Sequence, residues 1–230
     1  MTGKTHRVGG MLCCLGGYSL LSSKGLLPSN MNPMLQLLVM YPFAIYGSTV
    51  SDLDHDWHSA PSRDIISFGI NKALHLTTKV RSGMREDSPM YKALGLFDAK
   101  HRSWQTHSDL FLAVMLYLAL WLVNTAKVGT VDQVFLRLIS IGMILGVISH
   151  LILDMLTPEG VWSLILCVVR KVSGIWSIPR KIHFVPKSEF FKTGGTWETI
   201  IRWLLWLACF IMLGKILLDW SPISLSFIRG

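Results

Sequence analysis

Charged residues are scarce in this chain. Asp, Glu, Lys and Arg make up 16% of its 230 residues, whereas soluble domains typically carry about 25%. Hydrophobic residues account for 51%, and the mean hydropathy is +0.45. This balance is unusual for a soluble domain, so the composition favours insertion into a membrane.

Acidic residues are also few. The chain has 14 of them against 22 Lys and Arg, which gives a formal net charge of +8. An excess of positive charge can indicate nucleic-acid binding. In a membrane protein, however, Lys and Arg accumulate on the cytoplasmic side because of how the chain inserts. We favour the second explanation and expect no nucleic-acid partner.

Cysteine is rare and lacks metal-binding spacing. The 4 cysteines all lie in apolar surroundings and show no zinc-ribbon pattern, so we interpret them as small hydrophobic residues. Internal repeats and low-complexity tracts are absent from the sequence too. We therefore expect a single membrane-embedded helical domain covering residues 1–230.

Long apolar runs are what the sequence does contain. They approach the roughly 20 residues that a helix needs to cross a bilayer. The predicted fold class is an all-α, polytopic membrane protein with about five transmembrane helices. The candidate spans are Val8–Leu27, Met34–Val50, Leu110–Val128, Val134–Met155 and Thr199–Leu218. The first run resembles a signal peptide, but it lacks a convincing small-x-small cleavage site, and we expect it to be retained.

The distribution of Lys and Arg predicts the orientation. If five spans alternate and the amino terminus is inside, the charged segments 51–109 and 157–198 both lie in the cytoplasm. The short connectors, residues 29–33 and 129–133, then lie outside and carry almost no positive charge, as the positive-inside rule requires. We expect a multi-pass protein of the bacterial inner membrane. Within the first segment, Asp64–Val80 has a pattern compatible with a surface helix.

Histidine and aspartate gather at one end of the predicted spans. His6 precedes the first span, and the segment "SDLDHDWH" (Ser51–His58) follows the second. The segment "KHRSWQTH" (Lys100–His107) precedes the third, and His150 with Asp154 closes the fourth. In the five-span topology all of these positions lie at cytoplasmic helix ends.

These residue types are the usual ligands of zinc and similar divalent ions. His150 and Asp154 are four residues apart, which places them on one face of a helix. Asp52 and Asp54 are two apart and can face the same way in an extended segment. His101 and His107 are six apart, so we expect a bend between them. A His150–Asp154 hydrogen bond without metal, and a solvated acidic turn at Asp52, Asp54 and Asp56, are the structural alternatives.

Several motifs together resemble a known family. The motifs "MTGKTH", "SDLDHD", "HRSWQTHS", "SHLILDMLTPEGV" and "TGGTWE" are similar, in this order, to those of the YdjM-like inner-membrane metal-dependent hydrolases. That family is distantly similar to zinc-dependent phospholipase C, an all-helical phosphoesterase. Ser51 stands where the family has Pro and Ser103 where it has Gly, and one extra residue separates His101 from His107.

The resemblance implies a cytoplasmic-face metal site and its ligands. The implied ligands are His6, Asp52, Asp54, His101, His107, His150 and Asp154. Thr106, Ser108 and Thr157 would orient them through hydrogen bonds. The implied cofactor is zinc or another divalent metal, bound as one ion or as more than one.

The expected activity is metal-dependent hydrolysis of a phosphoester. Asp52 or Asp54 would take a proton from water, and Arg102 would clamp the phosphate. We expect a lipid phosphate as the substrate, because a site at the membrane surface lies directly beside the lipid headgroups. The alternative is a non-catalytic protein with a structural metal site that docks a cytoplasmic regulator through the basic segment Arg170–Lys192. Metal transport is disfavoured, because no series of acidic or polar residues crosses the predicted spans.

Overall fold

The computed structural model describes residues 1–29, 31–54, 76, 79–94, 106–126, 130–185 and 193–220. The chain divides into two compact units. The first unit contains Met1–Thr49, Val114–Gly160 and His183–Gly230, and the second contains Val50–Ala113 and Val161–Ile182. Each unit is described separately below.

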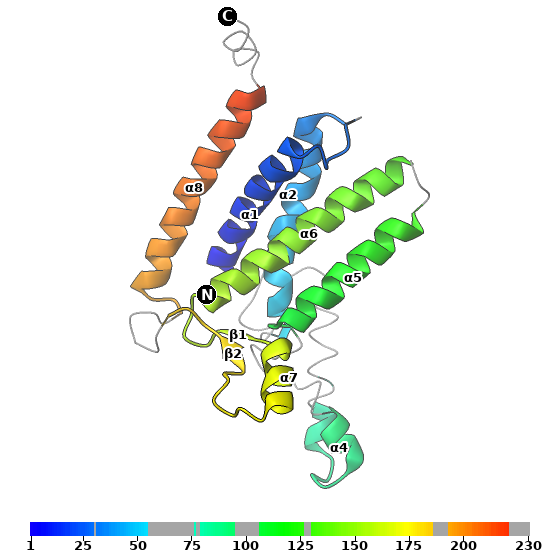
Figure 1. The fold of residues 1–230 in the computed structure, drawn as a ribbon, viewed down its shortest axis with the longest axis vertical. Coiled ribbons are helices and arrows are strands. Elements are labelled where there is room, and N and C mark those ends of the chain that lie inside the picture. The colour runs from blue at the N-terminus through cyan, green and yellow to red at the C-terminus, as the bar shows by residue number, and fades with distance from the viewer. Residues whose placement is uncertain are drawn as a thin grey trace, which may run out of the picture. The chain divides into compact units, whose positions relative to one another are not determined.

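Helices occupy the positions of the predicted spans (Figure 1). They are α1 (Gly3–Ser23), α2 (Pro33–Val50), α5 (Asp109–Thr125), α6 (Val131–Met155) and α8 (Thr196–Trp220). In the first unit α1 packs against both α6 and α8. Helix α6 ends at Met155, just before Thr157-Pro158, because Pro disfavours helical geometry in the residue before it.

Among the described helices, α6 and α8 are long and apolar enough to cross a membrane, as judged by length and composition. Helix α5 is apolar but has 17 residues, about 25 Å of helix against a hydrocarbon core of about 30 Å. Large apolar side chains on α8 face outward, including Trp203 at 69% and Phe210 at 66% exposure. Such surface is typical of helices that contact lipid or a partner. The total of five spans stays a prediction.

Glycines bring α2 and α6 into backbone contact. A Cβ atom at Gly142 would fall on the carbonyl oxygen of Met40, and one at Gly146 on that of Ala44. Small residues at such positions are what allow membrane helices to approach closely. Gly142 and Gly146 are one helical turn apart, and continuing this spacing leads to His150 and Asp154 on the same face of α6. The glycine contacts therefore position the end of α6 that carries these two residues.

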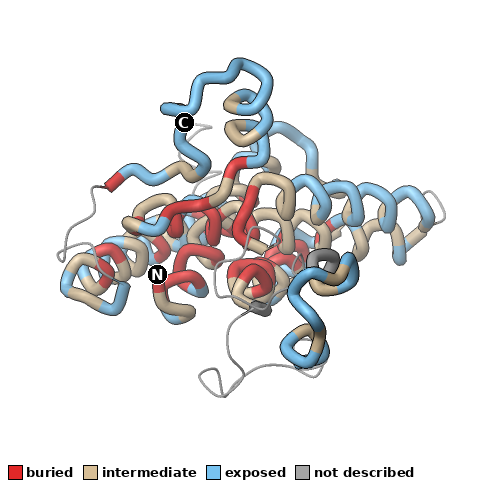
Figure 2. Tube along the Cα trace, turned by 90° about the horizontal axis from the view of Figure 1, so that it is seen from below, coloured by how far each residue is buried: buried red, intermediate tan, exposed pale blue. Residues whose placement is uncertain are grey.

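The buried core of the first unit lies between α1, α2, α6 and α8. Met40 and Leu138 are fully buried there, together with Cys14. The 4 cysteines are reduced, which is consistent with their interpretation as small hydrophobic residues. Figure 2 shows the buried and exposed stretches along the chain.

The second unit holds shorter elements. They are η1 (Ser51–Asp54), α4 (Pro89–Leu94), the start of α5, β1 (Val161–Trp162), α7 (Leu164–Ser173) and β2 (Lys181–Ile182). Strand β1 pairs antiparallel with β2, with Val161 opposite Ile182. The all-α prediction holds for the bulk of the described chain but missed this strand pair, because two-residue strands are too short to show an alternating pattern. The predicted surface helix Asp64–Val80 falls mainly outside the described residues.

Replacing Gly146 with Ala should destabilise the first unit by about 1 to 3 kcal/mol, because the new methyl group forces α2 and α6 apart. Thermal unfolding of the detergent-solubilised protein measures this. Gly16→Ala on α1 is the matched control, since its Cβ would meet nothing within 4 Å and Ala is the better helix former. Equal unfolding temperatures for the two variants would contradict the close packing.

Candidate metal centre

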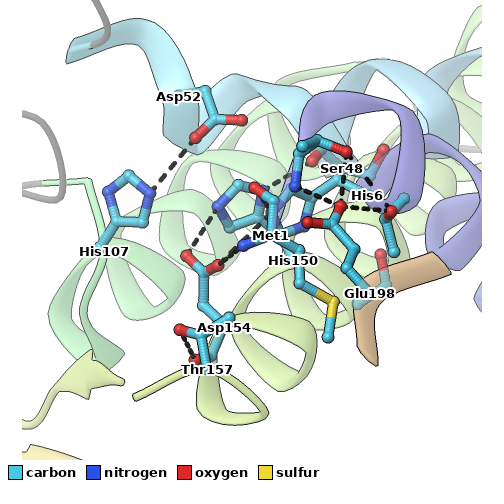
Figure 3. Close-up of polar contacts among 12 residues, drawn as sticks. Met1, His6, Ser48, Asp52, His107, His150, Asp154, Thr157 and Glu198 are labelled. Atoms are coloured by element: carbon cyan, nitrogen blue, oxygen red, sulfur yellow. Dashed lines mark hydrogen bonds and ion pairs between the residues drawn. The ribbon is translucent and has the colours of Figure 1, made fainter. Parts of the chain in front are cut away.

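Four helix ends of the first unit meet around a cluster of polar side chains (Figure 3). Helices α1 and α8 begin there, and α2 and α6 end there. Polar contacts join α6 to α2 and to α1. His150 on α6 contacts the Ser48 carbonyl of α2, and His6 on α1 contacts Asp154 on α6. The sequence prediction that the His6 and Asp154 ends lie together is therefore confirmed within this unit.

His150 and Asp154 lie one turn apart in the last part of α6. Nε2 of His150 is 3.3 Å from Oδ2 of Asp154, and the two side chains are 0% and 1% exposed. Nδ1 of His150 is 2.7 Å from the carbonyl oxygen of Ser48. A carbonyl oxygen can only accept a hydrogen bond, so Nδ1 carries the proton. In the neutral ring Nε2 then has a lone pair directed toward the carboxylate, and a proton or cation between them stabilises this arrangement.

His6 completes the cluster from the first turns of α1. Its ring stacks on that of His150, with ring centroids 3.8 Å apart and an interplanar angle of 15°. Its Nε2 is 3.4 Å from Oδ1 of Asp154. Burial and the neighbouring His150 ring lower the pKa of His6 to about 4, so the ring is neutral at pH 7. Nδ1 of His6 is buried without a hydrogen-bond partner among the described residues.

Asp154 also has a positively charged neighbour. The amino nitrogen of Met1 lies 3.1 Å from its Oδ1, and both groups are 1% exposed. A buried carboxylate needs such compensation, because losing its hydration is costly. The ion pair is a metal-free explanation for Asp154 and is the structural alternative to a ligand role.

Glu198 fastens the start of α1 to the start of α8. Its Oε1 accepts hydrogen bonds from the Thr2 amide and the Thr5 hydroxyl at 2.6 Å each, and Oε2 accepts one from the Gly194 amide at 2.7 Å. The Thr2 hydroxyl also donates to Oε1. Thr2 is the N-cap residue of α1, and its side chain makes no capping bond of its own. The Glu198 carboxylate instead accepts the Thr2 amide, one of the donors that the start of a helix leaves without an intrahelical partner. A negative charge at this end also complements the helix dipole.

The second unit contains a separate carboxylate–imidazole pair. Nε2 of His107 is 3.5 Å from Oδ1 of Asp52, with His107 fully buried and Asp52 16% exposed. The Thr106 hydroxyl lies 2.9 Å from Nδ1 of His107, so Thr106 orients the ring as predicted. The backbone carbonyl of His107 accepts a hydrogen bond of 3.0 Å from the Trp162 amide, which ties this residue to β1.

The remaining predicted residues have different outcomes. Asp54 ends η1, but its side chain falls outside the described part of the structure, as do His101 and Arg102. Thr157 donates to the backbone carbonyl of Asp154 at 2.8 Å, and so fixes the end of α6. Ser108 accepts a bond of 3.2 Å from the Phe111 amide, and this bond caps α5. That all seven ligands share one centre stays a prediction.

Sequence reasoning missed the role of Glu198. Glu198 lies in the first turn of α8, where an acidic residue is a common helix-start signal and indicates nothing more. The contact with Thr2 and Thr5 spans 193 to 196 positions of sequence, and no local pattern reports such a pairing. The motif "TGGTWE" was the available signal.

The fold and the cluster together define a class: a helical protein with bilayer-length apolar helices and a buried His–His–Asp group at one helix end. The chain belongs to the YdjM inner membrane protein family, whose sequence model matches residues 1–221. The family resemblance and the inner-membrane character expected from the sequence are thereby confirmed. No curated protein and no solved structure matches the chain.

Replacing Glu198 with Ala should lower the free energy of unfolding by about 3 kcal/mol, because the buried Thr5 hydroxyl and the amides of Thr2 and Gly194 lose a charged acceptor. Chemical unfolding in detergent, followed by circular dichroism, measures the loss. Glu86→Ala at an exposed position should change it by less than about 0.5 kcal/mol. If both variants unfold alike, Glu198 does not hold α1 in place.

Proposed function

We propose that this protein is a membrane-bound, metal-dependent hydrolase that acts on a phosphoester at the membrane surface. The observation that carries the proposal is the buried cluster of His6, His150 and Asp154 in an inner membrane protein family. Buried ionisable groups at the end of a membrane helix are costly and usually serve a function.

The donor set of this cluster fits a zinc-like ion. Two neutral imidazoles and one carboxylate are ligands that zinc accepts, and Nδ1 of His6 is a buried donor atom without a hydrogen bond among the described residues. The Ser48 carbonyl fixes the tautomer of His150, as the outer partners of metal-binding histidines commonly do. When bound, a divalent ion supplies a Lewis acid that acidifies water and offsets negative charge on phosphoryl oxygens.

The pair of Asp52 and His107 can move a proton. The Asp52 carboxylate is the more accessible partner, at 16% exposure, and lies 3.5 Å from the imidazole. In our proposal Asp52 accepts a proton from water, and His107, oriented by Thr106, stabilises the protonated pair. Asp54, His101 and Arg102 keep the roles that the family resemblance implies, as further ligands and as a phosphate clamp.

The proposed substrate is a lipid or another membrane-surface phosphoester. His150 and Asp154 lie in the last turns of α6, a helix long enough to cross the bilayer. A centre at the end of such a helix lies close to the headgroup layer, where a lipid phosphate can reach it while the lipid stays in the bilayer. We propose that this end, with the amino terminus, faces the cytoplasm.

Replacing Asp154 with Asn should reduce bound metal at least tenfold, since losing one ligand or its support typically costs this much affinity. Inductively coupled plasma mass spectrometry of chelator-free protein measures metal per chain. Asp132→Asn is the matched control, an exposed aspartate in the first turn of the same helix. Absence of metal from the unaltered protein, or equal metal in both variants, would contradict the metal centre.

Catalysis itself is tested with vesicles that contain phosphatidic acid and phosphatidylglycerol. Asp52→Asn should lower turnover about 100-fold or more, the usual contribution of a general base, and a chelator should abolish turnover until zinc is returned. Mass spectrometry of the lipid products measures both effects. Full turnover by the Asp52→Asn or the His150→Ala variant would rule out this mechanism.

A structural metal site that docks a cytoplasmic regulator is the second candidate, and the low exposure of the cluster favours it. His6, His150 and Asp154 are at most 1% exposed, and structural zinc sites are closed whereas catalytic sites keep an open position. One ion per chain, lost only on unfolding and with no turnover, would support the structural role. Two or more ions, with a water position that exchanges, would support the hydrolase.

A further inference from the structure

Helix α7 is amphipathic with its apolar face turned outward. Side chains along one face are exposed, among them Ile165 at 67%, Val168 at 52% and Val172 at 83%. With 3.6 residues per turn these positions span less than half of the helix circumference. Leu166 and Arg170, on the opposite side, are only partly exposed. An isolated soluble protein rarely shows an apolar stripe of this kind.

The helix is firmly anchored within the second unit. Asp109 at the start of α5 accepts hydrogen bonds from the Leu164 amide at 2.7 Å and from the Ser163 hydroxyl at 2.8 Å. Ser163 in turn caps the helix by accepting a bond from the Leu166 amide. The exposed face is therefore a fixed surface of the second unit.

The segment that contains α7 is basic, and Asp109 is the acidic group that contacts the start of this helix. Residues 161–182 contain four basic residues and no acidic one, and the basic ones are Arg170, Lys171, Arg180 and Lys181. Two tryptophans flank the helix and lie under cations: the Arg170 guanidinium is 5.0 Å from the Trp176 ring, and the Lys181 ammonium is 4.9 Å from the Trp162 ring. Trp with Lys or Arg is the combination found at the boundary between lipid and water.

We propose that α7 lies flat in the headgroup region of an anionic phospholipid leaflet, with Ile165, Val168 and Val172 among the acyl chains. Its 10 residues extend about 15 Å, half of what a span needs, so the helix lies in the interface plane. The basic residues complement the negative lipid surface. Because the His107 backbone bonds to Trp162 beside this helix, the Asp52–His107 pair is held near headgroup depth. This inference concerns placement and does not depend on catalysis.

Site-specific photo-crosslinking of the full-length protein tests the proposal. A benzophenone amino acid is introduced singly at Ile165, Val168 or Val172, and at Lys171 or Ser173 as matched exposed positions on the polar flanks. The protein is reconstituted in phosphatidylcholine vesicles with phosphatidylglycerol and irradiated. Lipid adducts, identified by mass spectrometry, should be several-fold more abundant at the three apolar positions. Unchanged thermal unfolding shows that each variant is folded.

A second arm tests the lipid charge. The Lys171→Gln/Arg180→Gln variant with benzophenone at Val172, and the same probe in vesicles of phosphatidylcholine alone, should each lose several-fold of the lipid adducts. Equal yields of lipid adducts at all five positions would overturn the placement of α7. The same result would follow if the apolar positions, irradiated in native membranes, crosslinked to a protein instead of to lipid. Adduct yields that do not respond to either charge change would overturn the assignment of anionic lipid.

Discussion

The need to compensate a buried carboxylate at the end of α6, a helix long and apolar enough to cross a membrane, governs this structure. Asp154 is 1% exposed, and among the described residues its oxygens lie next to the positively charged amino group of Met1 and the imidazoles of His6 and His150. A carboxylate buried there without partners would lose its hydration and gain no hydrogen bond or ion pair in exchange. The helix ends that supply these groups must therefore meet, although their residues are up to 153 positions apart.

Close helix packing makes this meeting possible. Gly142 and Gly146 let α6 touch the backbone of α2, and the same face continues to His150, whose Nδ1 reaches the Ser48 carbonyl. Glu198 fixes the other side by holding Thr2 and Thr5 at the start of α1. The position of the His6 ring against His150 is thus set by two features. The backbone contacts between α2 and α6 place His150, and the Glu198 carboxylate places the start of α1, which carries His6.

The sequence predicted the elements that depend on local patterns. The apolar runs located five helices, and the four-residue spacing of His150 and Asp154 placed both on one buried face. It missed the β1–β2 pair, because two-residue strands are too short to show an alternating pattern. It also missed the contact of Glu198 with α1, because the two segments lie 193 to 196 positions apart and no local pattern links them. His107 and Asp52 were both expected at cytoplasmic helix ends and, from the family resemblance, as ligands, but their direct contact was not predicted. The roles of Asp54, His101 and Arg102 stay predictions.

X-ray absorption spectroscopy at the zinc edge, on full-length protein purified without chelator, tests the metal centre most directly. Ligation by His6, His150 and Asp154 predicts nitrogen and oxygen neighbours at about 2.0 to 2.2 Å and the outer-shell scattering of imidazole. This signal should be lost in the His150→Ala variant. A spectrum without zinc or any other divalent metal, or one dominated by sulfur at about 2.3 Å, would contradict a histidine–aspartate centre.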